Sequence, residues 1–463
     1  MSPRERLGPV RMDRVALVAP VGALRSVLVE VADAGVVELD AVTENVVPAP
    51  APATAGLRAA WGSDGLEPRL AREAPNESSL ATDHEPAVLA GEAELARKRQ
   101  GAVVKGRVAA LLGWAPERTL EDLRARVAPH GGAVVALARP VGVEPPTLLA
   151  PRGVAAPFRP LVDIYGTVRY TDVDPTPFAA IAFAVMFGMM FGDVGHGVVL
   201  VMLALRARTG RGVLGRFRAA WPLGVAAGAV AVVFGVAYGE LFGPTGALPA
   251  LWLRPLDDPM RLLVAGVVVG AVLLGASEVI ATINRWREGG FARALYDRSA
   301  IAGLCWFAGL GLLGSGLAEK AGVLALSGAV VLAAGTVLVF VGSVVGGGGI
   351  GQAVVESFDG ILRLGSNLVS FARLAAFGLT HAAITLVVWD GTTALWHPSP
   401  SAVGAVLLFA VGNALAFALE LLVVGVQALR LEYYELFSRI FGEEGRPFRP
   451  WHIPLDGRPS EAS

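Results

Sequence analysis

The sequence is poor in charged residues and in cysteine, and each shortage excludes a class of protein. Only 17% of the 463 residues are charged, against roughly 25% in an average soluble domain, and the mean hydropathy is +0.57. These values exclude a disordered chain and a purely soluble enzyme. The formal net charge is −1, so no basic surface for nucleic acid is expected. The single cysteine, Cys305, excludes an intrachain disulfide.

Recognisable catalytic motifs are also missing from the sequence. The four glycines Gly346–Gly349 lack the Lys-Ser/Thr pair of a phosphate-binding loop and follow an apolar run, so we interpret them as a flexible turn. The histidines do not follow the spacing of metal ligands. The sequence therefore predicts no nucleotide site, no metal site, no cofactor and no catalytic residue in this chain.

Residues 1–160 are rich in charge and contain no apolar run long enough to cross a bilayer. Met12–Ala19 predicts a strand, and Val21–Ala34 predicts an amphipathic helix that Gly35 ends. Charged residues follow Met1 without an apolar stretch, so no signal peptide is expected. Further along, we expect linkers over Val46–Ala53, which is rich in Pro and Ala, and Ser63–Asp83, which is polar. The patterns then predict a helical stretch over Glu85–Leu112, a short helix over Leu120–Val127 and a strand over Ala133–Leu137. We interpret residues 1–160 as a small cytoplasmic α+β domain with a helical arm.

Beyond residue 160 the apolar runs recur at a length that fits a bilayer, which needs about 20 helical residues. We expect about eight transmembrane helices in residues 161–445, the last two long and tilted, followed by a cytoplasmic tail over 446–463. The expected spans are Phe178–Phe191, Val194–Leu205, Ala219–Tyr238, Leu262–Ile283, Ala300–Ala318, Ala321–Val345, Leu364–Val388 and Ala402–Leu429. The fold class is therefore an α-helical polytopic membrane protein with a small N-terminal α+β domain.

The distribution of arginine between the loops predicts the orientation. Arg206–Arg218 and Arg285–Arg298 are rich in arginine, whereas Gly239–Pro259 and Asp390–Ser401 are poor in it. The positive-inside rule places the arginine-rich loops in the cytoplasm. With eight crossings, both termini are then cytoplasmic as well.

Charged residues inside the last two apolar runs are the strongest functional signal. Arg373 lies near the middle of its run with no acidic residue within four positions, although an arginine at a helix centre costs about 2.5–3.5 kcal/mol. In the last run a polar residue recurs every seventh position, at Asn413, Glu420, Gln427 and Tyr434, with Arg430 beside it. Two such stripes predict a polar interface shared by the two helices. Alternatively, Glu420 and Arg430 pair within a helix bundle, or Arg430 reaches the membrane edge.

Three further acids lie in or next to apolar segments. Asp193 follows a glycine-rich stretch that also contains His196, and helix packing accounts for the glycines but not for these two residues. Glu240 follows the third expected span and fits an interfacial carboxylate. Glu278 is expected either to have a function or to pair with an arginine such as Arg285.

Four blocks of sequence resemble the a/I subunit (116 kDa subunit) of rotary V-type and V/A-type ATPases. The blocks are Asp174–Phe178 with Met186–Gly197, Tyr238–Gly243, Glu356–Gly360 with Ser366–His381, and Glu420–Arg430 with Leu431–Arg449. The N-terminal region is similar in Met12–Asp40 and in Gly113–Pro116. It is shorter than is usual in this family, which has a longer coiled-coil arm.

The resemblance implies a membrane stator subunit that forms two ion half-channels against a proteolipid (c/K) ring. Arg373 matches the essential arginine of the seventh helix, Arg430 its partner on the eighth, and Gln427 faces the same way. By the same resemblance the remaining half-channel residues are Glu420, His381, Asp193, Glu240, Asp359 and Ser366. Arg373 would favour ionisation of the ring carboxyl opposite it and would block a direct proton leak, because a guanidinium cannot relay a proton.

The same resemblance implies the partners, the location and an indirect link to ATP. The partners are the proteolipid ring, peripheral-stalk E/G-type subunits, the central-stalk and catalytic subunits, and the lipid bilayer. The location is the cell membrane of a prokaryote, and proton or sodium transport is coupled to ATP hydrolysis or synthesis elsewhere in the complex. Two alternatives stay open: a stand-alone secondary transporter that uses Arg373 for an anionic substrate and Glu420 for protons, and a structural scaffold.

Overall fold

The computed structural model describes residues 8–40, 67–73, 86–140, 142–149, 153–297, 300–396, 401–442 and 444–456. The expected linkers Val46–Ala53 and Ser63–Asp83 lie largely or wholly outside these ranges. The chain divides into two compact units, Met1–Leu149 with Gly445–Ser463, and Ala150–Glu444. We call them the N-terminal unit and the membrane unit.

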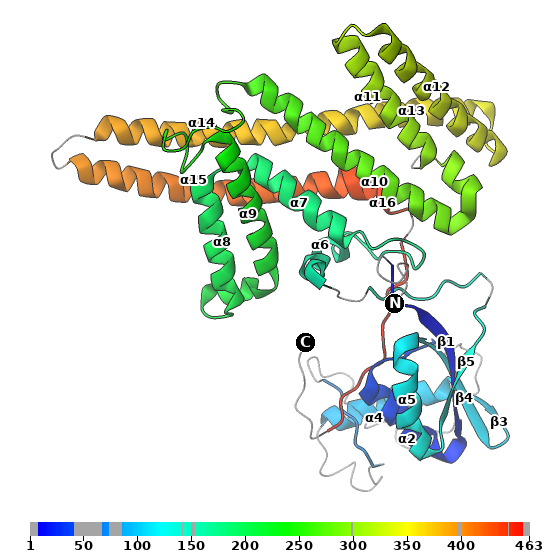
Figure 1. The fold of residues 1–463 in the computed structure, drawn as a ribbon. Helices are drawn as coiled ribbons and strands as arrows, with labels where there is room; N and C mark the ends of the chain where they lie inside the picture. Colours follow the sequence, from blue (N-terminus) through cyan, green and yellow to red (C-terminus); the bar gives the residue numbers. More distant parts are fainter. Residues whose placement is uncertain are drawn as a thin grey trace. The chain divides into compact units, whose positions relative to one another are not determined.

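The N-terminal unit is an antiparallel sheet covered on one face by helices (Figure 1). The strands β1 (Met12–Pro20), β2 (Glu38–Leu39), β4 (Val108–Pro116) and β5 (Ala133–Leu137) lie in the order β2-β4-β1-β5, and β3 (Val103–Lys105) pairs with β4. Alternate residues of β1 and β4, such as Leu17 and Leu111, are buried with apolar residues of α2 (Leu24–Ala34) and α5 (Leu120–Val127). Gly35 ends α2 in the left-handed conformation, as expected from the sequence.

The opposite face of this sheet carries exposed apolar side chains. The cross-strand row that joins Leu112, Ala16 and Val135 lies on it, and so does the row that joins Val103, Ala110, Val18 and Ala133. Its exposed members are Val103, Val108, Leu112, Val135 and Leu137. We call these five residues the open face.

The C-terminal segment belongs to the core of the N-terminal unit. Trp451, Ile453 and Leu455 are buried in the same apolar cluster as α2, and Leu455 forms a parallel bridge with Leu70. Residues 446–463 were expected as a separate tail. Three apolar residues at alternating positions give the segment a buried side, which explains why it packs here.

The helical stretch expected over Glu85–Leu112 is wrong in its second half. Helix α4 (Pro86–Gln100) ends at Gln100, and β3 and β4 follow after it. Gly106 adopts a positive φ of 63° in the turn between these two strands, a conformation that favours glycine. Burial of Ala109 and Leu111 on one side of β4 shows the period of two that the expected helix concealed.

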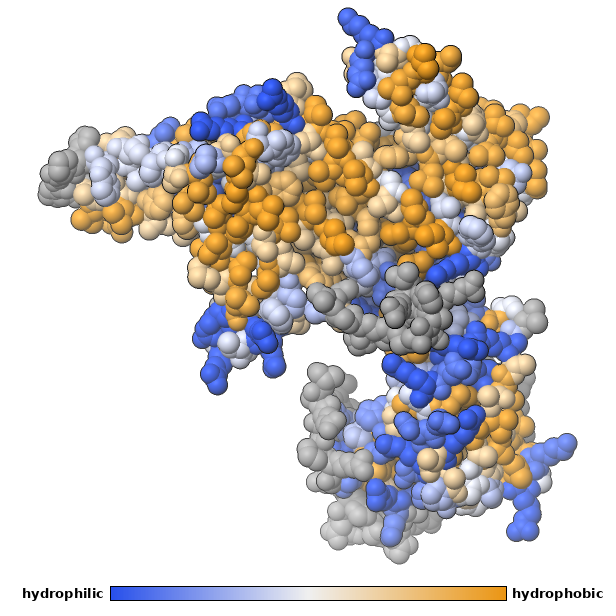
Figure 2. All heavy atoms as spheres, in the orientation of Figure 1, coloured by the Kyte–Doolittle hydropathy of each residue, from blue (hydrophilic) through white to orange (hydrophobic). Residues whose placement is uncertain are grey.

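Among its described residues, the membrane unit contains six helical segments long and apolar enough to cross a bilayer. They are Gly215–Tyr238, Pro259–Tyr296, Ile301–Ala318, Gly322–Val345, Ile350–Leu395 and Ala402–Ile440. Figure 2 shows the apolar surface over this unit and hydrophilic residues at the tip that joins α8 (Val194–Arg208) to α9 (Trp221–Tyr238). The polytopic helical class is confirmed, while the count of eight crossings and the cytoplasmic termini stay predictions.

The first expected pair of spans consists of two short helices, α7 (Thr176–Met190) and α8, with 15 residues each. Both helices pack against α9, and glycines permit the close approach. A Cβ atom built on Gly197 would lie 2.8 Å from the backbone oxygen of Gly228, and one built on Gly228 would lie 2.8 Å from that of Gly197. The glycine-rich sequence therefore serves packing of α8 on α9.

The helix α10 (Pro259–Tyr296) corrects the expected loop over Arg285–Arg298. The chain continues as helix to Tyr296, with one interruption at Gly289 and Gly290, where Gly290 has a φ of 71°. Arg285 is buried and pairs with Glu288 at 2.8 Å and with Asp297 at 3.1 Å. Glu288 and Asp297 neutralise the charge of Arg285 within the helix end, so this arginine-rich stretch forms a kinked helix instead of a loop.

Two long helical segments close the membrane unit and run side by side (Figure 1). The first comprises α13 (Ile350–Ser370) and α14 (Ala372–Leu395), and the second comprises α15 (Ser401–Leu431), a π-helix (Glu432–Phe437) and α16 (Ser438–Ile440). In Figure 1, α8 and α9 run across the direction of α14 and α15. Helices α11 (Ile301–Ala318) and α12 (Gly322–Val345) form a separate hairpin that packs against α10 and α13.

Candidate functional site: a buried ionisable cluster and a groove beside Arg373

Five ionisable side chains from different elements meet inside the membrane unit. Asp193 caps the N-terminus of α8 and His196 lies on its first turn, while Glu240 directly follows α9. His381 lies on α14 and Glu420 on α15. We call these five residues the His381 cluster; none is more than 7% exposed.

His381 is the centre of the cluster. Its Nδ1 atom is in short contact with the Glu420 carboxylate. Its Nε2 atom lies 3.6 Å from Glu240 Oε2 and 3.8 Å from Asp193 Oδ2. One imidazole therefore has a carboxylate on one nitrogen and two more beside the other, an arrangement suited to exchanging a proton between them.

Asp193 also has a structural task in this arrangement. Its Oδ1 atom accepts hydrogen bonds from the backbone N–H groups of His196 at 2.9 Å and Phe242 at 3.0 Å. Its Oδ2 atom accepts one from the N–H of Gly243 at 2.6 Å. A single carboxylate thus caps α8 and holds the turn after Glu240 in place, with Phe242 and Gly243 both at positive φ.

Glu240 connects the cluster to a cavity of about 240 Å³. The cavity lies beside the connection from α9 to α10, and its lining includes Arg254 and Asp257 as well as Glu240. Two charged residues at its wall make it a polar entrance to the buried side chains. The arginine-poor connection Gly239–Pro259 was expected on the outer side of the membrane.

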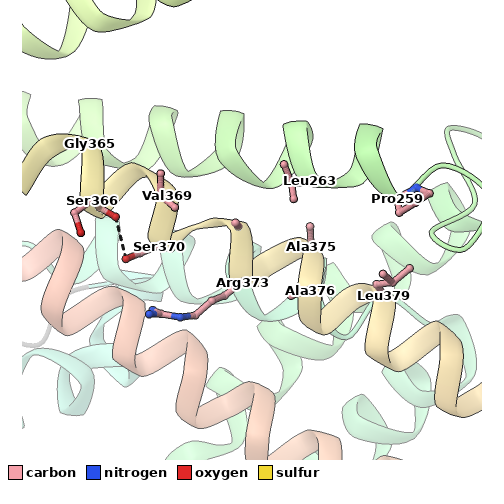
Figure 3. Close-up of a pocket in the computed structure, with 11 residues that line it drawn as sticks. Pro259, Leu263, Gly365, Ser366, Val369, Ser370, Arg373, Ala375, Ala376 and Leu379 are labelled. Atoms are coloured by element: carbon pink, nitrogen blue, oxygen red, sulfur yellow. Dashed lines mark hydrogen bonds between the residues drawn. The ribbon is translucent and has the colours of Figure 1, made fainter.

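Arg373 lies in a different environment, beside a cavity of about 700 Å³ that α10, α13 and α14 line. Figure 3 shows its side chain leaving α14 and running back toward Ser370, whose hydroxyl donates to the Ser366 carbonyl at 3.2 Å. Within the described residues, Arg373 makes no hydrogen bond and no direct ion pair, but its charge interacts at longer range with the buried acid Glu435 of the π-helix. We call this cavity the Arg373 groove.

The remaining expected site residues do not join the His381 cluster. Asp359 on α13 pairs with Arg363 at 2.8 Å and is half exposed, and Ser366 lines the Arg373 groove. Arg430 is exposed on α15, and Gln427 is half-buried. The roles assigned to all nine residues by resemblance stay predictions, and the structure brings together four of them: Asp193, Glu240, His381 and Glu420.

The heptad stripe of the last helix is only partly buried. Asn413 and Glu420 are buried, but Tyr434 is 70% exposed. An α-helix drifts by about 20° per heptad, and the π-helix Glu432–Phe437 adds a further offset. The stripe therefore turns away from the interface before it reaches Tyr434.

Sequence reasoning missed three features of the site. His196 was noticed without being given a role, although its spacing of three from Asp193 fits a capped first turn. Glu432 is fully buried on the π-helix, and its two carboxylate oxygens have no hydrogen-bond partner among the described residues. Glu278 pairs with Arg439, so the suggested pairing with Arg285 is wrong in its partner. Sequence spacing could not reveal a contact between residues 161 positions apart.

Asp172 is an acid in the connection before α7, outside the spans, and its pKa differs strongly from the ordinary value. Burial raises its pKa to about 7, and the negative charge of Glu288 adds to this effect. Thr171, Arg285 and Arg169 act in the opposite direction. The neighbouring backbone is fixed, since the N–H of Val173 donates to the Asn284 side chain at 2.9 Å.

Part of the His381 cluster has the composition of a metal site. The ligand atoms of Asp193, His196 and His381 all lie within 4.8 Å of one another, and the three residues are buried. Among the described residues, neither ring nitrogen of His196 nor the Nε2 atom of His381 has a hydrogen-bond partner. These groups are free to bind an ion or water.

The fold and the site define a polytopic helical membrane protein with ionisable groups in its spans. Many families belong to this class, and comparison with known sequences indicates one of them. Residues 102–209 match the model of the V-type ATPase 116 kDa subunit family. The chain is 28% identical over 367 residues to the A-type ATP synthase subunit I of Thermococcus kodakarensis, which covers 74% of this chain and 54% of that protein. It is 29% identical over 404 residues to the subunit I of Archaeoglobus fulgidus, covering 74% and 58%. These matches support membership of the chain in the V-type ATPase 116 kDa subunit family.

This chain and its relatives also differ in length. The chain spans about half the length of the curated relatives it matches. The region matched by the family model runs from β3 to the end of α8.

Proposed function

We propose that the chain is the membrane stator subunit of a rotary V/A-type ATPase. It forms ion half-channels against a proteolipid ring and couples proton or sodium movement to ATP hydrolysis or synthesis in other subunits. The observation that carries the proposal is Arg373, an arginine in a membrane-spanning segment without an ion pair among the described residues. A charge there is costly without a close counter-charge. The interaction with Glu435 is not a direct ion pair, and a carboxylate on a ring subunit is the partner that would form one.

Three members of the His381 cluster, Glu240, His381 and Glu420, support a path from one side of the membrane toward Arg373. Glu240 lines the cavity by the α9–α10 connection, and His381 lies within 3.6 Å of Glu240 and contacts Glu420. A proton or cation entering the cavity thus meets three ionisable groups in succession. His381 and Arg373 lie on the same helix, eight residues or about 12 Å apart, so this path ends within reach of the groove.

The open face of the N-terminal unit supports a contact with a peripheral-stalk subunit. Isolated exposed apolar residues are ordinary on a protein surface, whereas a group of them on one sheet face indicates a protein interface. An amphipathic helix of an E/G-type stalk subunit has a complementary apolar face. This contact would hold the membrane unit against the torque of the ring.

Transport by the reconstituted complex tests the central proposal. Vesicles that contain the complete complex should acidify, or take up sodium, when ATP is added, and Arg373→Gln should abolish this transport while the proteolipid content stays normal. Vesicles that contain this chain alone should show no transport of ions or of organic anions. Transport by the chain alone would instead favour the stand-alone transporter.

Recovery of the stalk subunits tests the role of the open face. Val135→Glu puts a charge on this face, at the edge strand β5, and should reduce co-purification of the E/G-type subunits several-fold. Val104→Glu is the matched control, because Val104 is a β3 residue 57% exposed on the opposite side of the strand. Equal recovery with both variants would exclude the open face as the stalk contact.

A further inference from the structure

The His381 cluster brings nitrogen and oxygen donors close together. His381 Nε2 lies 3.6 Å from Glu240 Oε2 and 3.8 Å from Asp193 Oδ2. His196 lies across from His381, with ring centroids 5.5 Å apart and planes at 79°. Both ring nitrogens of His196, together with His381 Nε2 and Glu240 Oε2, are buried without a hydrogen-bond partner among the described residues.

The groups behind these donors are arranged as they are around metal ligands. A histidine that binds a metal through one nitrogen usually has a carboxylate or carbonyl on the other, and Glu420 contacts the Nδ1 atom of His381 in this way. Asp193 is held by three backbone N–H groups, those of His196, Phe242 and Gly243. Two of the donors are therefore oriented before any ion binds.

We propose that the His381 cluster binds one Zn²⁺ ion through Asp193, His196 and His381, with Glu240 as the fourth ligand. Two imidazoles and two carboxylates form a four-ligand set that suits Zn²⁺. Mg²⁺ and Ca²⁺ prefer six or more oxygen ligands, so they fit the set poorly. The negative charge of the carboxylates offsets that of the cation in the buried site.

The two distances measured from His381 Nε2 require only a small contraction. Bonds of about 2.0–2.2 Å to a tetrahedral zinc ion place the ligand atoms roughly 3.4 Å apart, and the two separations from His381 Nε2 exceed this by a few tenths of an ångström. His196 and Glu240 move further, since the ligand atoms of Asp193, His196 and His381 lie within 4.8 Å of one another and Glu240 is outside this group. The cavity at Glu240 provides the entrance.

Binding there has a consequence that rests on the proposed function. A zinc ion held by Glu240 and His381 occupies the groups through which the proposed path runs. Micromolar Zn²⁺ should therefore inhibit transport from the side of the α9–α10 connection, and removal of zinc with a chelator should restore it.

Direct binding tests the site independently of transport. Bound Zn²⁺ is measured for the purified, nucleotide-free complex of wild type and of His196→Phe. The wild-type complex should bind one more Zn²⁺ per copy of this chain than the His196→Phe complex. Co²⁺ should give the visible absorption of a tetrahedral site in the wild-type complex only. Phenylalanine preserves the aromatic contacts of His196 with Phe191, Phe242 and Phe417. His130→Phe, a change in the N-terminal unit, is the control and should leave zinc binding unchanged. Equal zinc binding by wild type and His196→Phe would overturn the proposal.

Transport then separates the site from the path. His196→Phe should transport within about two-fold of wild type in the absence of zinc, because no step of the path uses His196. It should raise the Zn²⁺ concentration for half-inhibition about ten-fold or more, the loss expected when a metal site is weakened. Zinc that binds in a His196-dependent manner without inhibiting transport would support the site and contradict the path. If His196→Phe and wild type were inhibited equally, inhibition through this site would be excluded.

Discussion

Arg373 and His381 lie on one helix, yet their surroundings solve the problem of a buried charge in opposite ways. His381 is enclosed by three carboxylates from three other elements of the fold. Arg373 lies beside an open groove and has no ion pair among the described residues. The histidine is in direct contact with its counter-charges, whereas Arg373 interacts with Glu435 only at longer range, so a direct partner for it has to come from outside the chain. Substitutions should therefore be severe at Arg373 and graded in the cluster.

The largest effect is expected for Arg373→Lys compared with Arg430→Lys. An apolar site favours the neutral form of lysine, while arginine stays charged, so Arg373→Lys should reduce coupled transport on the order of 100-fold or more. Arg430 lies near the C-terminal end of α15, which we expect on the cytoplasmic side, where water supports either cation. Arg430→Lys should therefore be milder. ATP-driven acidification or sodium uptake in vesicles measures both. Full transport by Arg373→Lys would contradict the contrast between Arg373 and the His381 cluster. Equal losses of transport in Arg373→Lys and Arg430→Lys would contradict the expected ranking of the two arginines.

A smaller loss is expected for Glu420→Gln. The amide still contacts His381 but cannot carry a proton, and Glu240 and water remain beside the imidazole. We expect a loss on the order of ten-fold, less than the 100-fold or more that a sole proton-transfer group contributes. Asp359→Asn serves as the comparison, because Asp359 pairs with Arg363 away from the cluster and should change transport less. Wild-type turnover of Glu420→Gln would remove Glu420 from the path.

Asp193→Asn should affect stability more than transport. The amide group that replaces Oδ1 or Oδ2 cannot accept from a backbone N–H, so at least one of three hydrogen bonds is lost. Leaving a buried N–H unsatisfied costs about 1–3 kcal/mol, which should lower the melting temperature of the detergent-purified complex by several degrees. Thr385→Val, a nearby buried substitution outside the carboxylate's hydrogen bonds, provides a reference. A transport defect with unchanged melting would contradict the anchoring role.

The smallest effect is a pH dependence at Asp172. The folded state raises its pKa to about 7, so the fold favours the protonated acid. This stabilisation is complete below the ordinary pKa near 4, declines between about pH 4 and pH 7, and is absent above the folded pKa. Asp172→Asn removes the cost of the charge, so its melting temperature should exceed that of wild type by an amount that grows from pH 5 to pH 7. A difference that stays constant over this range would show that Asp172 keeps its ordinary pKa.

The sequence was informative where a single physical demand dominates. Crossing a bilayer requires a long apolar helix, and the expected runs Ala321–Val345 and Ala300–Ala318 coincide closely with α12 and α11. It failed where two patterns compete. Apolar residues in Glu85–Leu112 fit a helix as well as a strand, and only pairing of β4 with β1 decides between them.

The residues of the site differ in the same way in how far the sequence reveals them. An acid or arginine within an apolar run is visible without a structure, so Arg373, His381 and Glu420 could be selected from the sequence. The meeting of Asp193 and Glu240 with His381 could not be derived from spacing, because it depends on how α7 and α8 pack against α9 and how α7 packs against α14. The seven-residue repeat misled at Tyr434, since an inserted π-turn changes the direction of every later side chain.

That π-turn also determines which changes in chain length the protein can tolerate. A π-turn is an α-helix with one residue added, and each residue of an α-helix turns the chain by about 100°. Deleting one residue within Glu432–Phe437 would restore the regular helix and swing Arg439 away from Glu278, leaving a buried carboxylate without its cation. A one-residue deletion among the four glycines Gly346–Gly349 should be far milder, because it shortens a turn. Related chains that keep the Arg439–Glu278 pair should therefore keep the residue count between Arg430 and Arg439, however much their glycine turns vary in length.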